Sequence, residues 1–341
     1  MLFENRKTGY SAEVCFRPFA KGDGVAFCQC IDDFYDGGYP YKEYLDEEFL
    51  LEKIAAGDMT VLCGTTPSGE IISTSALCMC PEFKGSALLM LRVVKKTYRD
   101  MGIGNAQEDY LFRLAEEHDT IRSLYADVMT HNSISQRGLV RRGFVYCGIR
   151  MMLYRNPVMV PRLGLPEDGK VSQVVMCRSV CTHPVGKLHC PAAHEYVVRR
   201  IYSELGIKCQ LDAGEMMPAH EKTHASWHTD EKHHSAILTV HLVGKDFPEI
   251  LSNNLGQLSQ WKTATMLCYL NLCDASAVSA YSVLENNGFF FTGIKPLQEK
   301  EEYMILANVG RQKIRYEDIH LHDSGKQLLS YIQQHRGGSS T

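Results

Sequence analysis

The stretch Arg99-Asp100-Met101-Gly102-Ile103-Gly104 decides the fold of this chain. It follows residues 88–94, which are almost wholly apolar, as in a strand that is covered on both faces. It precedes residues 103–114, in which apolar side chains recur at the spacing of one helix face. A strand that runs through a glycine-containing loop into a helix offers free backbone amides and the positive end of the helix dipole. The stretch therefore predicts an anion site.

A second element follows farther along the chain. Residues 123–128 predict a short strand, and His131-Asn132-Ser133 can cap a helix. That helix is expected to end at Arg142-Gly143, because glycine suits the position after a helix and basic residues suit its last turn. Residues 144–147 then predict another strand.

Together these residues resemble the GNAT superfamily of acyl-CoA N-acyltransferases. The first family motif, Gln/Arg-x-x-Gly-x-Gly/Ala after the fourth strand, is matched by Arg99, Gly102 and Gly104. The second, a capping Asn, a helix and Gly-Phe, is matched by Asn132 and Gly143-Phe144. The resemblance covers roughly residues 12–156. It implies an α/β fold (α+β mixed sheet), a twisted mixed sheet with helices on both faces, and acetyl-CoA or another acyl-CoA as the donor.

The resemblance also implies a donor site for the co-substrate acetyl-CoA. Its pyrophosphate would lie on the loop formed by Arg99, Asp100, Met101, Gly102, Ile103, Gly104 and Asn105. The Arg99 side chain could add positive charge. Val94, at the end of the preceding strand, matches the position whose backbone pairs with the pantetheine arm, and Asn132 matches an Asn that contacts the donor. Helix capping alone is the other interpretation of Asn132.

The catalytic groups are less defined. The family often carries a Tyr as general acid four residues before the glycine of the second motif, but Leu139 stands there. Tyr146 could substitute or could simply belong to the core, and the thiolate could also leave unassisted, because an ordinary thiol has a pKa of about 8.5. Candidates for the general base are His131, Glu82 and Asp127, with a chain of waters as the alternative. His131 and Asp127 could equally cap a helix, and Glu82 could be a solvated turn carboxylate.

Length and composition restrict the class of protein. The 341 residues suit two domains, at about 150 residues each. A hydrophobic content of 45% and a net charge of −4 indicate a soluble globular protein without general affinity for nucleic acid. The chain has no apolar stretch long enough for a membrane span, and its start is too polar for a signal peptide. Most of the 13 cysteines lie in apolar strand patterns, which favours free thiols in the cytoplasm.

The second half of the chain repeats features of the first. Residues 156–170 hold three prolines and two glycines and predict a linker between domains 1–156 and 157–341. Gly288-Phe289 follows a predicted helix, as Gly143-Phe144 does 145 residues earlier (288 − 143). A further strand pattern comes soon after each, at residues 151–154 and 303–306. The whole chain therefore resembles a tandem-GNAT protein.

The second copy lacks the phosphate loop. Its strand pattern at 237–243 is followed by Gly244-Lys245-Asp246-Phe247-Pro248-Glu249, in which the two acids would repel a pyrophosphate. We therefore expect a degenerate C-terminal copy that does not bind coenzyme A in the usual way. The roles left open for it are covering a sheet edge, closing one side of the acceptor cleft, or forming a homodimer.

Residues 215–241 are rich in histidine, the members being His220, His224, His228, His233 and His234. The region has no Cys-x2-Cys or His-Glu-x-x-His pattern, so a hairpin is the preferred interpretation and no metal is expected. A metal-dependent hydrolase in this half is the least favoured function.

Two functions of different classes remain. The first is an N-acetyltransferase that acts on a primary amine of a small molecule, peptide or protein by direct attack. The second is a non-catalytic acyl-CoA-binding or scaffold protein, because the usual Tyr and strand carboxylate are missing. Residues 32–56, rich in acidic and aromatic side chains, would form one wall of an acceptor cleft for a cationic amine, or simply an amphipathic surface.

Overall fold

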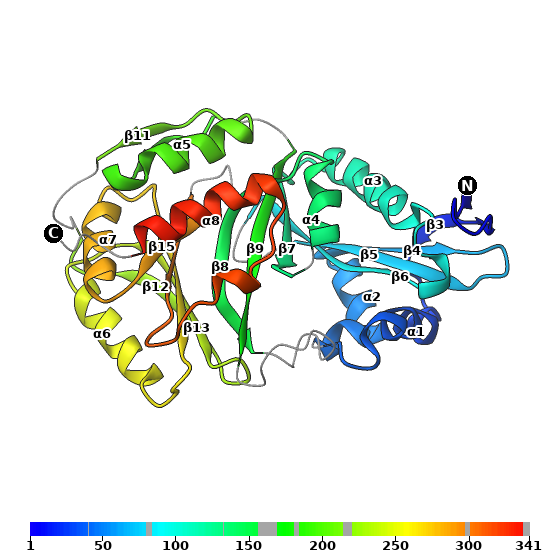
Figure 1. Cartoon of the computed structure of the whole chain (residues 1–341), viewed down its shortest axis with the longest axis horizontal. Helices are drawn as coiled ribbons and strands as arrows, with labels where there is room; N and C mark the ends of the chain where they lie inside the picture. The colour runs from blue at the N-terminus through cyan, green and yellow to red at the C-terminus, as the bar shows by residue number, and fades with distance from the viewer. Residues whose placement is uncertain are drawn as a thin grey trace. The chain divides into compact units, whose positions relative to one another are not determined.

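The computed structural model describes residues 1–39, 41–79, 84–131, 133–155, 169–180, 184–213, 220–296 and 301–336 (Figure 1). Within them the chain forms two compact units, which we call unit 1, Met1–Ala126, and unit 2, from Asp127 onward. The predicted domains, 1–156 and 157–341, have other limits. Those limits remain a prediction.

Unit 1 is a mixed sheet with helices on both faces (Figure 1). The order across its sheet is β3-β4-β5-β6-β7, in which only β6 and β7 are parallel. A small hairpin, β1–β2, precedes the sheet. The elements are β1 (Leu2–Glu4), β2 (Ser11–Glu13), β3 (Cys15–Pro18), α1 (Gly24–Tyr35), α2 (Glu47–Ala55), β4 (Met59–Thr65), β5 (Ile71–Met79), β6 (Ser86–Val94), α3 (Ile103–Glu116) and β7 (Ser123–Met129), the last of which continues into unit 2.

Neighbouring residues of β5 show how both faces of this sheet are covered. Ile71 packs in a cluster with Phe27 and Ile31 of α1, whereas Ile72 packs with Met101 and Ile103 at the start of α3. Successive side chains of a strand point to opposite faces, so α1 and α3 cover opposite sides. The predicted mixed sheet with helices on both faces is therefore confirmed.

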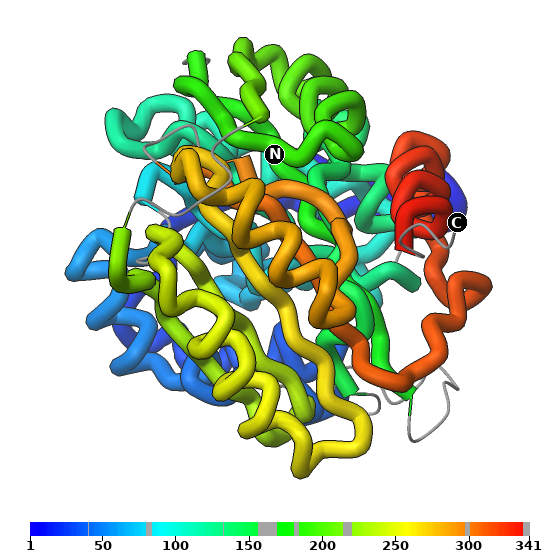
Figure 2. The backbone as a smooth tube through the Cα atoms, turned by 90° about the vertical axis from the view of Figure 1, so that its left-hand side faces the viewer, coloured from blue at the N-terminus to red at the C-terminus, as the bar shows by residue number. Residues whose placement is uncertain are grey.

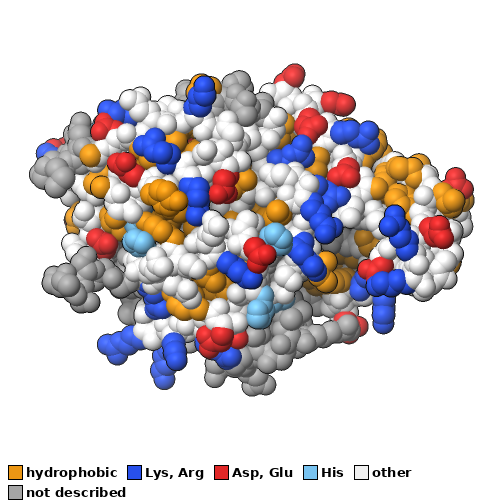
Figure 3. All heavy atoms as spheres, turned by 45° about the horizontal axis from the view of Figure 1, so that its top comes forward, with side chains coloured by type: hydrophobic (Ala, Val, Ile, Leu, Met, Phe, Trp, Pro, Cys, Tyr) orange, Lys and Arg blue, Asp and Glu red, His pale blue; other side chains and the backbone are white. Residues whose placement is uncertain are grey.

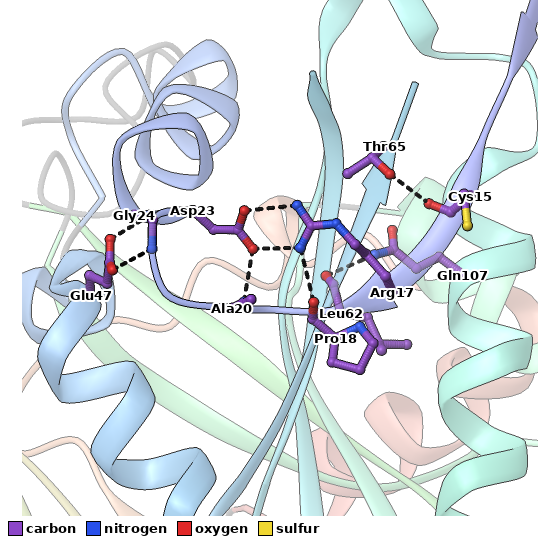
Figure 4. A network of polar contacts seen from close by, with 11 residues as sticks. Cys15, Arg17, Pro18, Ala20, Asp23, Gly24, Glu47, Leu62, Thr65 and Gln107 are labelled. Atoms are coloured by element: carbon purple, nitrogen blue, oxygen red, sulfur yellow. Dashed lines mark hydrogen bonds and ion pairs between the residues drawn. The ribbon is translucent and has the colours of Figure 1, made fainter. Parts of the chain in front are cut away.

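An ion pair and a helix cap fix the start of α1 (Figure 4). The Arg17 guanidinium donates to both carboxylate oxygens of Asp23, at 2.6 and 2.8 Å, which lowers the pKa of Asp23. The Glu47 carboxylate accepts from the amides of Gly22 at 2.7 Å and Gly24 at 2.9 Å. Negative charge at this end of a helix is stabilising. Glu47, which belongs to the acidic segment predicted as an acceptor wall, thus caps a helix.

Unit 2 is also a mixed sheet with helices. Its strand order is β12-β13-β14-β16-β15-β8-β9, in which only β13 and β14 are parallel. The helices α6 and α7 run side by side (Figure 2). The elements are α4 (Ser133–Val140), β8 (Val145–Arg155), β9 (Lys170–Ser179), β10 (Lys187–His189), α5 (Glu195–Glu204), β11 (Gln210–Asp212), β12 (His224–Asp230), β13 (Ser235–Leu242), α6 (Phe247–Leu258), β14 (Thr265–Asn271), α7 (Ala277–Asn286), β15 (Phe290–Lys295), β16 (Tyr303–Asn308) and α8 (Asp323–His335).

The ends of α4 and α7 repeat each other closely. Gly143 follows α4 with φ 81°, and Gly288 follows α7 with φ 82°. In both cases the next phenylalanine amide donates to a leucine carbonyl five residues earlier: Phe144 to Leu139 at 3.1 Å, and Phe289 to Leu284 at 3.0 Å. A positive φ favours glycine, which explains why the sequence pattern recurs.

The repeat extends to the pairing of β8 with β15. Gly148 lies opposite Gly293, and these two positions are also 145 residues apart (293 − 148). Gly293 has φ +144°, and a Cβ added to it would overlap the backbone of Cys147 and Gly148. The two strands approach so closely that only glycine fits at this crossing.

One predicted strand is wrong. Residues 151–154 do not form a separate strand, because β8 continues without interruption from Val145 to Arg155. The register between β8 and β9 shifts between Arg150 and Tyr154, and Met152 has φ 49°. An irregularity of this kind bends a strand without ending it. The antiparallel neighbour of β8 in the sequence is β9, beyond residues 156–168; the predicted linker falls almost wholly in that segment, outside the described residues.

Surface and membrane features complete the description. Acidic and basic side chains are interspersed on the face that Figure 3 shows. Every described cysteine is a free thiol. No helix in the described ranges is both long and apolar enough to cross a membrane.

Candidate functional site

The strand that leads to the glycine loop, β6, bends at a bulge. Leu91 has φ 54°, and the register between β5 and β6 shifts between Thr74 and Ala76. The Thr74 hydroxyl donates to the Leu91 carbonyl at 2.7 Å and holds the bulge in place. Bulges of this kind redirect the end of a strand.

Beyond the bulge, one edge of β6 has no partner strand in the described part of unit 1. β7 pairs with β6 only over Ser86–Leu88, although β6 continues to Val94. The Lys95 amide donates to the Ile72 carbonyl at 2.9 Å. Because backbone groups alternate between the two edges of a strand, the N–H and C=O of Val94 point away from β5. Val94 therefore presents its backbone at the edge where a pantetheine arm was predicted.

The loop after β6 ends in an uncapped helix. Asp100 has φ 64° and Gly102 has φ 84°, so the chain turns sharply before α3 begins at Ile103. No side chain in the described residues caps this end of α3. The first amides of a helix have no acceptor within it, so those of Ile103, Gly104 and Asn105 remain available to an anion. A Cβ on Gly102 would meet no atom within 4 Å, which leaves the surrounding space open.

Gly104 joins the loop to the strand end. A Cβ built on Gly104 would lie 3.1 Å from Cγ2 of Val94. A side chain there would press against the strand that carries the free backbone edge. The structure thus brings together the predicted donor residues Val94, Arg99, Asp100, Met101, Gly102, Ile103, Gly104 and Asn105 in one part of unit 1.

Arg99 is held by neighbours within unit 1. Its Nε donates to the Val94 carbonyl at 2.9 Å, and its guanidinium lies 5.3 Å from the ring centre of Phe34. Asp33, one residue earlier in α1, lies 3.5 Å from Nη2 of Arg99 and accepts from the Lys96 amide at 2.6 Å. These contacts let Arg99 position the end of β6, which the sequence did not indicate. The role of the Arg99 charge in binding a phosphate remains a prediction.

The N-terminal hairpin contacts the same loop. The Asn5 side-chain amide donates to the Arg99 carbonyl at 3.2 Å. Lys7 pairs with the Asp100 carboxylate at 3.2 Å, with both side chains largely exposed. An exposed pair contributes at most about 1 kcal/mol. The pair nevertheless places the ammonium group of Lys7 beside Asp100, the single acid of the loop. The sequence alone did not predict this contact.

Two of the proposed bases lie in unit 2. Arg150 Nη1 donates to Oδ2 of Asp127, and the same guanidinium donates to the Tyr269 hydroxyl at 2.6 Å and to Oε1 of Gln173 at 2.9 Å. Asp127 is thus one partner of a polar network. His131 lines a cavity of unit 2, and burial lowers the pKa of its imidazole. Glu82 and Asn132 lie outside the described residues, so all four assignments remain predictions.

Leu139, at the position of the usual general acid, and Tyr146, its possible substitute, are both packed in the core of unit 2. Leu139 is fully buried. The Tyr146 hydroxyl donates to Oε1 of Gln136 at 2.8 Å, and burial raises the pKa of Tyr146 to about 12. Gln136 in turn donates to the His320 carbonyl at 3.1 Å. This network favours the core interpretation of Tyr146, and the sequence gave no signal for Gln136.

The matching helix start in unit 2 is closed by the chain itself. The Val243 amide donates to Oδ2 of Asp274 at 2.6 Å, the Gly244 amide to Oγ1 of Thr223 at 2.9 Å, and the Lys245 amide to the His220 carbonyl at 2.9 Å. A Cβ on Gly244 would overlap the backbone of Lys222 and Thr223. At the start of α6 itself, the Phe247 amide donates to the Gly244 carbonyl at 3.1 Å, the Glu249 amide donates to the Asp246 carbonyl at 3.1 Å, and Pro248 has no N–H.

The described side chains of the acidic and aromatic segment 32–56 mainly form packing and capping contacts. Edge-to-face ring contacts run from Tyr35 through Tyr39, Tyr41 and Tyr44 to Phe49, with centroids 4.9 to 6.3 Å apart. Among the acids, Asp33 accepts from the Lys96 amide, Asp46 caps α2 and Glu47 caps α1. The observed contacts are those of an amphipathic surface, and an acceptor wall remains a prediction.

The histidine-rich region contains the predicted hairpin, formed by β12 and β13. No group of three or more His, Cys, Asp or Glu side chains suited to a metal occurs in the described residues. His241 instead contacts Glu301 at 3.0 Å and the Tyr303 hydroxyl at 2.8 Å.

The sequence matches no family model and no curated protein. Solved structures do resemble part of it. An acetyltransferase of the GNAT family from Streptococcus pneumoniae is 16% identical, with a TM-score of 0.41, over 50% of this chain and 100% of that one. A ribosomal-protein-alanine N-acetyltransferase from Brucella melitensis is 18% identical, with a TM-score of 0.40, over 48% and 99%. A GNAT acetyltransferase from Staphylococcus aureus Mu50 is 12% identical, with a TM-score of 0.37, over 50% and 100%.

Each of these solved structures is thus similar to about half of this chain, and at these identities and TM-scores none of their properties is carried over to it.

Proposed function

We propose that the protein is an N-acetyltransferase that binds acetyl-CoA in unit 1 and transfers the acetyl group to a primary amine of a small molecule, peptide or protein. The single observation that carries the proposal is that uncapped helix amides lie beside a strand edge without a partner strand in the described part of unit 1. The uncapped amides at the start of α3 suit a pyrophosphate, and the edge of β6 at Val94, where the N–H points away from β5 and the carbonyl accepts from Arg99, suits an amide-containing arm. Gly104 joins the two features.

The residues present fit such a donor. Gly102 and Gly104 leave the loop without side chains at the points of closest approach, and Lys7 lies beside Asp100. Backbone amides that are fixed before binding stabilise negative charge without reorganisation. Arg99 would keep the Val94 end of β6 in position through its bond to the Val94 carbonyl.

Acyl transfer by direct attack needs the amine to lose a proton as its nitrogen attacks the thioester carbonyl. The carbon–sulfur bond then breaks, and the sulfur leaves as a thiolate or is protonated. We keep His131, Glu82 and Asp127 as the candidates for the base. Tyr146 is a poor candidate for the acid, because its hydroxyl is buried and bonded to Gln136.

A non-catalytic acyl-CoA-binding protein is the alternative, favoured by Leu139 at the position of the usual acid. Release of free thiol from acetyl-CoA, measured with a panel of primary amines, distinguishes the two. An amine-dependent rate that Gly102→Glu abolishes supports the enzyme. Coenzyme A binding without amine-dependent release from any class of amine supports the scaffold.

We further propose that the chain is a tandem-GNAT protein whose second copy has lost the donor site. The repeated caps at Gly143 and Gly288 and the Gly148–Gly293 pairing support a duplicated unit. The closed start of α6 supports the loss. Calorimetry with coenzyme A should therefore give one site per chain, and two equivalent sites would contradict this.

A further inference from the structure

Unit 2 contains a cavity of about 350 Å³ that is not part of the proposed donor site, although one candidate base, His131, lies in its wall. Its walls come from the residues after β7, the bend in β8, the start of β9 and the segment after β16. Met152, Val171, Ile314 and Ile319 give it an apolar lining. The volume lies at the lower end of the range for small-molecule sites.

Lys170 is one of the polar residues that line this cavity. Its amine donates to the His234 carbonyl at 2.8 Å and to Oγ1 of Thr265 at 3.0 Å, both of which are neutral acceptors. An ammonium group has three protons to donate. No carboxylate in the described ranges forms an ion pair with Lys170, and no third acceptor is found there. Lys170 is half-buried, and its ammonium group has only neutral acceptors among the described residues, so it lacks a counter-charge there.

The charged surroundings do not supply that partner. Burial and the nearby charge of Arg155, opposed by Asp230, together lower the pKa of Lys170 to about 7. His233 and His234 lie in the turn after β12, and burial lowers the pKa of both. Of the other lining groups, His131 has a lowered pKa, Lys313 is basic, and Arg315 is paired with Asp318 at 3.0 Å. The environment of Lys170 therefore favours an added negative charge.

The walls are fixed before any ligand enters. Met152 has the positive φ of 49°, and its amide donates to the Ser172 hydroxyl at 3.0 Å. Gln312 donates to the carbonyls of Ala264 at 2.8 Å and Val309 at 2.9 Å. Backbone strain of this kind is found preferentially at functional sites. Nδ1 of His131 is buried without a partner among the described residues.

We propose that this cavity binds a small monocarboxylate, whose carboxylate accepts the third proton of Lys170 and whose apolar body lies against Met152, Ile314 and Ile319. This site is separate from the proposed donor site and does not depend on it. The carboxylate would supply the counter-charge that Lys170 lacks among the described residues, and the apolar walls would favour a short hydrocarbon chain over a polar one.

Binding should be linked to a proton. The carboxylate favours the charged amine, so it raises the pKa of Lys170 above its value of about 7 in the free protein. Above pH 7 the free protein must take up a proton when it binds, and the affinity should fall up to tenfold per pH unit. The histidines that face Lys170 have lowered pKa values and are already neutral there.

Calorimetry on the full chain with sodium butyrate tests the proposal. We expect one site, with an affinity that falls nearly a hundredfold from pH 7.5 to pH 9.5 and with proton uptake that appears as a dependence on the buffer's ionisation enthalpy. Butyramide, which has the same size without the charge, should bind at least tenfold more weakly. Absence of butyrate binding at pH 7.5, equal binding of butyramide, or an affinity independent of pH would overturn the proposal.

Three variants locate the site. Lys170→Met should abolish butyrate binding while coenzyme A binding and the circular dichroism spectrum stay unchanged. Lys170→Arg should keep binding but lose its pH dependence, because arginine stays charged. Lys326→Met, at an exposed lysine of α8, is the matched control and should behave as the natural chain does. Butyrate binding by folded Lys170→Met, or loss of coenzyme A binding with it, would refute the assignment.

Discussion

The substitution Gly102→Glu tests the predicted donor loop most directly. Gly102 has φ +84°, and a Cβ there meets no atom within 4 Å. Strain in the left-handed region should reduce the free energy of unfolding by about 1–2 kcal/mol, without a clash. The new carboxylate would stand beside the amides of α3. At about 5 Å and an effective dielectric constant of about 20, one pair of like charges costs about 3 kcal/mol. We therefore expect coenzyme A affinity to fall more than a hundredfold.

Gly69 offers a matched control. It has φ +87°, no atom lies within 4 Å of its Cβ position, and it belongs to the turn between β4 and β5. Gly69→Glu should therefore cost the same 1–2 kcal/mol of stability while leaving donor binding intact. Calorimetry with coenzyme A measures the affinity, and urea unfolding measures the stability of each variant.

Two results would refute this account of the loop. If folded Gly102→Glu bound coenzyme A as tightly as the natural chain, the uncapped amides of α3 would not be the cradle. If Gly69→Glu lost affinity to the same extent, the effect would come from general strain or charge. Gly102→Ala, which adds strain without charge, should lose less affinity than Gly102→Glu.

Three further predictions follow from packing and charge. Tyr146→Phe should slow acyl transfer less than tenfold, which is under about 1.4 kcal/mol, and should reduce the free energy of unfolding by about 1–2 kcal/mol through loss of the bond to Gln136; a hundredfold slower rate at unchanged donor affinity would make Tyr146 the acid. Gly293→Ala should reduce the free energy of unfolding by more than about 4 kcal/mol, because the added Cβ would overlap Gly148, whereas Gly256→Ala in α6 should increase it by up to about 1 kcal/mol. Equal urea midpoints of unfolding for the two variants would contradict the close pairing of Gly148 with Gly293. The hydrogen bond from Arg17 lowers the pKa of Asp23, so the ion pair stabilises the fold above about pH 4, and this stabilisation is lost as the pH falls through the lowered pKa of Asp23. In Asp23→Asn the free energy of unfolding should therefore fall less steeply at acid pH. An unchanged pH dependence at acid pH would argue against this.

Local chemistry made much of the fold predictable. The apolar run at 88–94 and the glycines at 102 and 104 belong to β6 and the start of α3 as predicted. The caps at Gly143 and Gly288 were readable because a positive φ restricts the residue type. In each case neighbouring residues in the sequence determine the conformation.

Contacts between distant residues could not be predicted in this way. The end of β8 looked like a separate strand, because a bulge interrupts the alternation of side chains without interrupting the strand. Arg99 binds the Val94 carbonyl instead of standing free, and Asp127 is paired with Arg150. Lys170 was only the last residue of the predicted linker. Its setting depends on Thr265, far along the chain. No local pattern carries that information.

The starts of α3 and α6 can be compared under the proposed duplication. The glycine caps at Gly143 and Gly288 and the close crossing at Gly148 and Gly293 are features that packing demands. The two helix starts differ in their amides. At α6 the Phe247 and Glu249 amides donate to the carbonyls of Gly244 and Asp246, and Pro248 has no N–H. Just before α6, the amides of Val243, Gly244 and Lys245 donate to Asp274, Thr223 and His220. The backbone of Lys222 and Thr223 fills the space beside Gly244. Restoring an Arg-x-x-Gly-x-Gly pattern before α6 would therefore not by itself create a second donor site. The segment from His220 to Thr223 would also have to move.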